Sequence, residues 1–282
     1  MAGVLALAAA VLYGTADFLG GVGSRRASAL SFLAVSAPVG AVIMLVAALA
    51  VGGPVTAGRL GWGLAAGAAS GAGVIVFFAG LAAGPISVVA PLSALGAALL
   101  PVAVAIADSE RLGTAVLAGA LLCLASVTLV SLERRPAPGR GRPPAIGAVA
   151  CGLAAGVTFG LYFLFIRNAA AAGGLWPLAV SRCTATTIVL ATAAWRRHRP
   201  VLPRAGRRLF GLALAAGAGD VGASLLYVLA VHSGPFALAA VITALYPAVT
   251  VLLARLVLGE QMRGTQRAGL ALGALGIILL TA

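Results

Sequence analysis

The sequence contains no lysine, only six acidic residues and two histidines. Charged residues make up 9% of the 282-residue chain, whereas a soluble domain carries about 25%. So little charge cannot cover the surface of a water-exposed globule, and 62% of the residues are hydrophobic. The composition therefore excludes an ordinary soluble domain and predicts an integral membrane protein, with the lipid bilayer as its solvent.

Few residues could bind a metal or form a catalytic site. The candidate ligands show no spacing typical of a zinc site; they are His198, His232, Cys123, Cys151 and Cys183. No HExxH, GxSxG or ATP-binding Gly-Lys-Ser/Thr motif occurs. We therefore expect no enzyme activity, no metal and no cofactor. If the protein moves a solute, the energy should come from a gradient or from exchange.

All 19 basic residues are arginines, and they give a net charge of +13. Such a charge can indicate nucleic acid as a partner, but these arginines stand mostly in short connections between apolar stretches. Arginine there orients helices and contacts anionic lipid head groups, so we expect no nucleic acid partner. The absence of lysine beside abundant alanine, glycine, arginine and proline is typical of GC-rich coding. It leads us to expect a bacterial plasma membrane.

Ten apolar stretches approach the length of about 20 residues that a membrane-spanning helix needs. They are 2–23, 29–51, 60–83, 86–107, 112–132, 144–167, 174–195, 208–232, 235–258 and 264–282. No basic segment precedes the first stretch, which we interpret as a spanning helix rather than a signal peptide. The Pro- and Arg-rich segment 133–143 separates five stretches from the other five, and we interpret it as a linker.

The two groups of five stretches repeat one pattern at an offset of 150 residues. Gly-Pro opens the fourth stretch of each group and a glutamate follows it: Gly84, Pro85 and Glu110 in the first, Gly234, Pro235 and Glu260 in the second. Similarity at a fixed offset indicates a duplicated unit, and an odd number of helices per unit makes the two units antiparallel. We therefore predict an all-α integral membrane protein with ten transmembrane helices in two inverted five-helix repeats, residues 1–132 and 144–282.

Arginine also predicts the orientation. Fourteen of the 19 arginines follow odd-numbered stretches and three follow even-numbered ones. The positive-inside rule then places the arginine-rich face in the cytoplasm and both termini outside.

Several glycines recur every fourth residue within the stretches. Such spacing lets helix backbones approach closely in a membrane, and we expect a packing role for Gly63, Gly67 and Gly71, for Gly152, Gly156 and Gly160, and for Gly269 and Gly273.

The duplicated pattern resembles the EamA-type permeases of the drug/metabolite transporter superfamily. The residues that carry the resemblance are Gly84, Pro85, Glu110, Gly234, Pro235, Pro247, Gly259 and Glu260, with the aromatic-glycine pairs Tyr13-Gly14 and Phe159-Gly160. The resemblance implies a secondary transporter of a small organic metabolite or drug-like molecule, typically an exporter, with alternating access between the repeats. It does not indicate the substrate, and the first repeat lacks a counterpart of Tyr246-Pro247.

Three charged residues lie well inside predicted spans: Asp17, Arg182 and Asp220. Such charges are costly in a bilayer and mark functional candidates. We predict that Asp17 or Asp220 binds a cationic group or a proton, and that Arg182 pairs with a carboxylate of the substrate or of the protein. The remaining candidates for a substrate or ion site are Tyr13, Ser224, Tyr227 and Tyr246; Tyr162 is assigned no role.

Other interpretations stay open at this point. A buried Asp–Arg pair could serve only to fix helix packing, and the tyrosines could serve only to pack. A flippase for a lipid or lipid-linked group has the same architecture, and a fold does not by itself establish flux, so a structural or sensory membrane protein is a further alternative. The sequence does not determine the oligomeric state, although a fused repeat is compatible with a monomer.

Overall fold

The computed structural model describes residues 1–24, 29–53, 55–83, 86–107, 114–131, 146–170, 174–196, 206–259 and 264–281. Within these ranges it contains eleven α-helices and no strand. The helices are α1 (Ala2–Ser24), α2 (Ala29–Val51), α3 (Ala57–Ala83), α4 (Ile86–Ala107), α5 (Thr114–Ser131), α6 (Ile146–Ala170), α7 (Trp176–Trp195), α8 (Gly206–His232), α9 (Phe236–Thr243), α10 (Tyr246–Leu258) and α11 (Gly264–Thr281). The predicted linker 133–143, Gly84, Pro85, Glu110 and Glu260 lie outside the described residues.

The chain is an all-α membrane protein. By length and apolar composition, seven segments of the described residues can cross a membrane: Ala2–Gly23, Leu30–Val51, Ala57–Phe77, Ile146–Ala169, Trp176–Trp195, Arg207–His232 and Phe236–Leu258. Two shorter apolar helical segments, Leu92–Val104 and Leu117–Leu129, lie within α4 and α5. The complete set of ten spans therefore stays a prediction.

The ninth predicted span, 235–258, is two helices rather than one. A turn at Ala244 and Leu245 separates α9 from α10. The N–H of Leu245 donates to the Ile242 carbonyl at 3.1 Å, and the N–H of Ala248 donates to the Leu245 carbonyl at 2.9 Å. Both bonds reach back three residues instead of four, and Pro247 has no N–H with which to continue the regular ladder. The predicted span 235–258 is therefore interrupted by this turn, next to Pro247.

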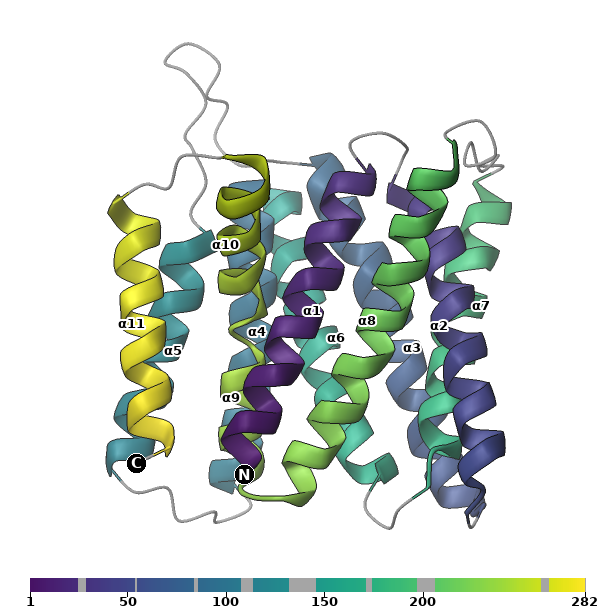
Figure 1. The fold of residues 1–282 in the computed structure, drawn as a ribbon, viewed down its shortest axis with the longest axis horizontal. Helices are drawn as coiled ribbons and strands as arrows, with labels where there is room; N and C mark the ends of the chain where they lie inside the picture. The colour runs from purple at the N-terminus through teal and green to yellow at the C-terminus, as the bar shows by residue number, and fades with distance from the viewer. Residues whose placement is uncertain are drawn as a thin grey trace.

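Helices from distant parts of the chain pack side by side, with both termini at the same edge of the bundle (Figure 1). α1 packs against α8, α9 and α10, whereas α6 packs against α3 and α4. α7 lies against α2 and α3, and α5 lies against α11. The core therefore forms between helices of the first half of the chain and helices of the second half.

Glycines permit the closest of these contacts. A Cβ added at Gly63 of α3 would collide with the Pro177 carbonyl oxygen on α7, and one added at Gly67 would collide with the Ser181 carbonyl oxygen. On α6, a Cβ at Gly156 would lie 2.9 Å from the Cα of Gly96 on α4. The four-residue spacing of these glycines thus marks close helix contacts, as expected.

Gly67→Ala should destabilise the protein by about 1–3 kcal/mol, because overpacking forces backbones apart. The added Cβ would meet the Ser181 carbonyl and would lie 2.6 Å from the Cβ of Thr184, and Ser181 precedes Arg182. The measurement is thermal unfolding of the purified protein in detergent, followed by circular dichroism.

The matched control is Gly61→Ala on the same helix, where an added Cβ meets no atom within 4 Å. Since alanine forms helices better than glycine by up to about 1 kcal/mol, this variant should unfold at or above the wild-type temperature. Equal unfolding temperatures for the two variants would contradict the close contact between α3 and α7.

Candidate functional site

Arg182 on α7 is the centre of a polar cluster inside the helix bundle. Its guanidinium forms an ion pair with the Asp220 carboxylate and donates to the Ser224 hydroxyl. It also reaches the Asp220 carbonyl at 3.3 Å and the Tyr162 hydroxyl at 3.4 Å. The side chain of Arg182 is 14% exposed and that of Asp220 is 36% exposed. One guanidinium therefore connects α7 with α6 and α8, and the carboxylate remains partly accessible.

Three hydroxyl groups extend this cluster to α1. The Tyr13 hydroxyl lies 2.8 Å from the Ser224 hydroxyl and 3.5 Å from the Tyr162 hydroxyl. The Tyr162 and Ser224 hydroxyls are 3.2 Å apart, and Ser224 also donates to the Asp220 carbonyl at 3.0 Å. The network thus joins α1, from the first half of the chain, to α6, α7 and α8 from the second.

Aromatic rings surround the polar groups. The Phe163 ring contacts Tyr227, Tyr162 and Tyr13, with centroids 4.8, 5.4 and 6.4 Å apart. Tyr13 in turn lies edge-on to Tyr246 of α10, with centroids 6.3 Å apart. The chain has four tyrosines, and all four belong to this group.

Tyr227 is the most enclosed member of the group. Its side chain is fully buried, and its hydroxyl has no hydrogen-bond partner within the described residues. A buried hydroxyl without a partner is rare because losing water without compensation costs about 1–3 kcal/mol. Tyr227 therefore places an unsatisfied polar atom inside the aromatic group.

Asp17 lies one helical turn beyond Tyr13 and shares its face of α1. Its side chain is exposed and has no hydrogen bond or ion pair within the described part of the chain. It is close enough to Asp220 and Tyr246 to interact with both electrostatically. With both carboxylates ionised, the two aspartates and Arg182 carry one net negative charge.

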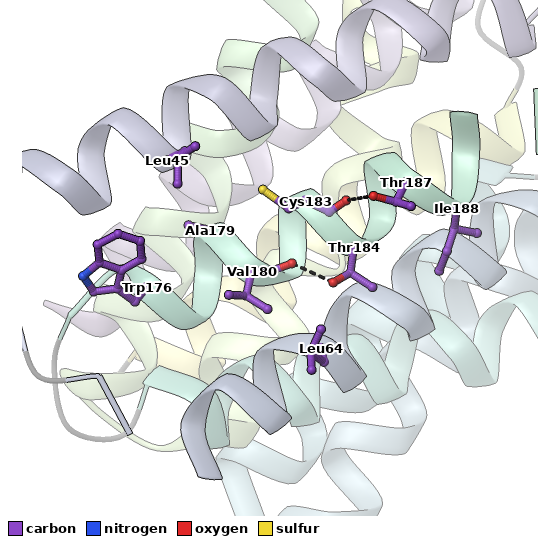
Figure 2. A pocket seen from close by; sticks show the side chains of 9 residues that line it. All are labelled: Leu45, Leu64, Trp176, Ala179, Val180, Cys183, Thr184, Thr187 and Ile188. Carbon is purple, nitrogen blue, oxygen red and sulfur yellow. Dashed lines mark hydrogen bonds between the residues drawn. The ribbon is translucent and has the colours of Figure 1, made fainter. Parts of the chain in front are cut away.

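A separate groove of about 350 Å³ lies on another face of α7, between α2 and α3 (Figure 2). Its lining residues are Leu45, Leu64, Trp176, Ala179, Val180, Cys183, Thr184, Thr187 and Ile188. The hydroxyls of Thr184 and Thr187 donate within α7 to the Val180 and Cys183 carbonyls, each at 2.8 Å. The groove therefore offers an apolar surface, and no charged residue lines it.

The structure brings most of the predicted site residues together. Hydrogen bonds or the ion pair join Tyr13, Arg182, Asp220 and Ser224, and the predicted pairing of Arg182 with a carboxylate is confirmed. Ring contacts add Tyr227 and Tyr246. Sequence reasoning missed Tyr162 and Phe163, although tyrosine is rare enough in this chain that Tyr162 could have been suspected. Gly217, three residues before Asp220 on α8, packs against the Ser36 carbonyl of α2.

These helices and intramembrane charges define a multi-pass membrane protein with an ionisable site in its core. Residues 146–282, which contain α6 to α11, match the model of the EamA-like transporter family. This match agrees with the predicted resemblance to the EamA-type permeases of the drug/metabolite transporter superfamily.

Solved structures support the fold of the whole chain. Among 28 matching chains, one described as the crystal structure of a protein superposes with a TM-score of 0.78. It is 21% identical, and the match covers 99% of this chain and 96% of that one. At this identity the likeness shows the fold alone. No curated protein sequence matches the chain significantly.

Proposed function

We propose that the protein is a secondary transporter that exports a small organic molecule by alternating access between two inverted five-helix repeats. The observation that carries the proposal is the ion pair of Arg182 with Asp220 inside the bundle, with a third charged residue, Asp17, one turn from Tyr13 of the same hydrogen-bond network. Ionisable groups are costly within a membrane and are kept there mainly for substrate, proton or ion pathways. The cluster would be the binding and coupling site.

The helix pairing supports two related repeats, residues 1–132 and 144–282 with the linker 133–143 between them. α1 packs on α8 as α6 packs on α3, and α1 packs on α9 and α10 as α6 packs on α4. α2 contacts α8 as α7 contacts α3. The contacts α2–α7 and α5–α11 each join a helix to its own counterpart in the other repeat, so they stay the same when the repeats are interchanged. A two-fold relation between the repeats would produce this pattern, which inverted-repeat transporters use for alternating access.

The cluster is placed to couple binding to movement. Tyr13 belongs to the first repeat, and its hydroxyl bonds Ser224 of the second. Rocking of one repeat against the other would change this contact. Protonation of Asp220 would weaken its pair with Arg182 and free the guanidinium from one acceptor, so a proton or a cationic substrate at the carboxylates can bias the repeats toward one arrangement.

A lipid flippase remains the alternative, since the groove between α2, α3 and α7 is exposed at Leu64 and Cys183. A flippase also needs polar groups for the lipid head group. The hydroxyls of this groove bond within α7, and Arg182 does not line it, so we favour a small-molecule substrate.

Metabolite profiling tests the proposal. Cells would express the wild type, Asp220→Asn, Thr187→Val or an empty vector, with membrane abundance measured for each. Wild type and Thr187→Val should lower a few metabolites inside the cell and raise them outside, because Thr187 bonds only within α7. Asp220→Asn should match the empty vector, because the neutral amide cannot balance the charge of Arg182.

Two results would count against the proposal in different ways. Identical profiles for all four strains, with each protein present in the membrane, would overturn metabolite transport and favour lipid movement or a role without flux. If the wild type and Asp220→Asn change the metabolite profile equally, and the pH dependence of transport is also the same, the transport proposal stands. Asp220 would then have no part in the coupling step.

A further inference from the structure

We propose that the ligand of this cluster is an organic ammonium ion with an apolar body, held by the carboxylate of Asp17 and the ring faces of Tyr13 and Tyr246. The inference rests on the transport function proposed above and adds the chemical class of the substrate. Three observations carry it: the charge balance of the cluster, the gathering of tyrosines, and the absence of charge at the repeat-related positions.

The charge balance favours a cation. Arg182 neutralises Asp220 and directs its remaining hydrogen bonds to the Asp220 carbonyl, Ser224 and Tyr162. An anionic ligand would have to displace these partners from the guanidinium. Asp17 has no such partner, and its side chain is accessible. One monovalent cation beside Asp17 would bring the net charge of the cluster to zero, which a low-dielectric membrane interior favours.

The aromatic groups indicate what kind of cation. Tyrosine rings attract cations over their faces, and quaternary ammonium groups are recognised by aromatic cages of this type. Tyr13 and Tyr246 are both partly exposed, and their ring planes meet at 60°. The Tyr13 hydroxyl is tied to Ser224, so its ring is held in place. Asp17 stands one turn from Tyr13 on the same face of α1, and the Tyr13 ring contacts that of Tyr246.

The repeat-related positions carry no charge. The aromatic-glycine pairs Tyr13-Gly14 and Phe159-Gly160 align the first helices of the two repeats. In this alignment Asp17 corresponds to Phe163. At the offset of 150 residues, Arg182 corresponds to Phe32, Asp220 to Ser70 and Tyr227 to Phe77. The rings of Phe77 and Phe159 also contact each other, with centroids 6.4 Å apart. The repeat-related positions therefore add no second ionisable group, which fits a ligand with a single cationic group.

Calorimetric titration of the purified full chain in detergent tests the inference with defined probes. Choline and its uncharged carbon isostere 3,3-dimethylbutan-1-ol test the charge; tetramethylammonium and benzyltrimethylammonium test the apolar body. Choline should bind and its isostere should not. Benzyltrimethylammonium should bind more tightly than tetramethylammonium by on the order of tenfold, because it also buries a phenyl ring.

Variants locate the site. Asp17→Asn should weaken benzyltrimethylammonium binding by about 100-fold or more, which corresponds to the loss of a close charge partner. Tyr246→Phe keeps the ring and should bind within a few-fold of the wild type, whereas Tyr246→Leu should bind much more weakly. Ser126→Ala, in the contact between α5 and α11, should bind as the wild type does.

The failures of the two proposals are distinguishable. Transport stands but the ammonium inference is overturned if the wild type shifts metabolites in cells and none of the three ammonium probes binds. The same conclusion follows if choline and its isostere bind equally. Unchanged binding in Asp17→Asn would overturn the assigned site. Absence of both a metabolite shift and probe binding would remove the transport function together with the inference.

Discussion

Arg182→Gln should abolish transport and lower the unfolding temperature more than any other single change in the cluster. The guanidinium serves four acceptors on α6 and α8, including the Asp220 carboxylate. Removing one partner of a buried ion pair costs about 3–5 kcal/mol. Since the Asp220 side chain is 36% exposed, the cost here should fall toward the lower end of that range. Thermal unfolding in detergent and the cellular metabolite profile are the two measurements.

The double variant Arg182→Gln/Asp220→Asn separates a structural role from a functional one. Removing both charges leaves no unbalanced ion, so the unfolding temperature should recover most of the loss. Transport should stay absent, because the amide pair can neither bind a proton nor change its charge. Transport restored by the double variant would mean that the pair only fixes the packing of α7 against α8. Arg182→Lys is a second control: it keeps the charge but lacks the planar fork that reaches several acceptors.

The membrane class and the pairing of Arg182 with a carboxylate could be predicted because the chain contains so few charged residues. With so few charges in the chain, a carboxylate inside an apolar span stands out in composition alone, and an arginine in another span needs a partner. Which carboxylate pairs with Arg182 could not be predicted. Asp17 and Asp220 are equivalent candidates until the lateral positions of the helices are known, and the structure pairs Arg182 with Asp220.

Tyr162 and the α9–α10 turn show a different limit. Helices that are apolar all round carry little signal of which face points inward, so the rarity of tyrosine could raise Tyr162 as a candidate but could not show that it joins the cluster. Pro247 did indicate a disturbed helix, but a proline can kink a helix or end it. Hydrogen bonds that reach back three residues at Leu245 and Ala248 end α9 and begin α10, and both helices pack against α1.

Asp17→Asn should abolish transport while leaving the unfolding temperature close to that of the wild type. Asp17 has no hydrogen bond or ion pair within the described residues, so the amide removes a charge without leaving a partner unsatisfied. The substitution therefore changes only what can bind at position 17, whereas Arg182→Gln also breaks contacts between helices. Metabolite profiling and thermal unfolding of the same preparations measure the two effects.

Asp17→Glu is the matched control for charge. It keeps the carboxylate but extends it by one methylene, so transport should be reduced rather than lost. The titratable groups that interact electrostatically with Asp17 are Asp220 and Tyr246, and Tyr13 stands one turn away on α1. Protons and a cationic substrate compete for the same carboxylate, so acidification should weaken ammonium binding to the wild type and have less effect on whatever binding Asp17→Asn retains. A large fall in the stability of Asp17→Asn, with transport intact, would instead make Asp17 a packing residue and leave the cluster without its binding carboxylate.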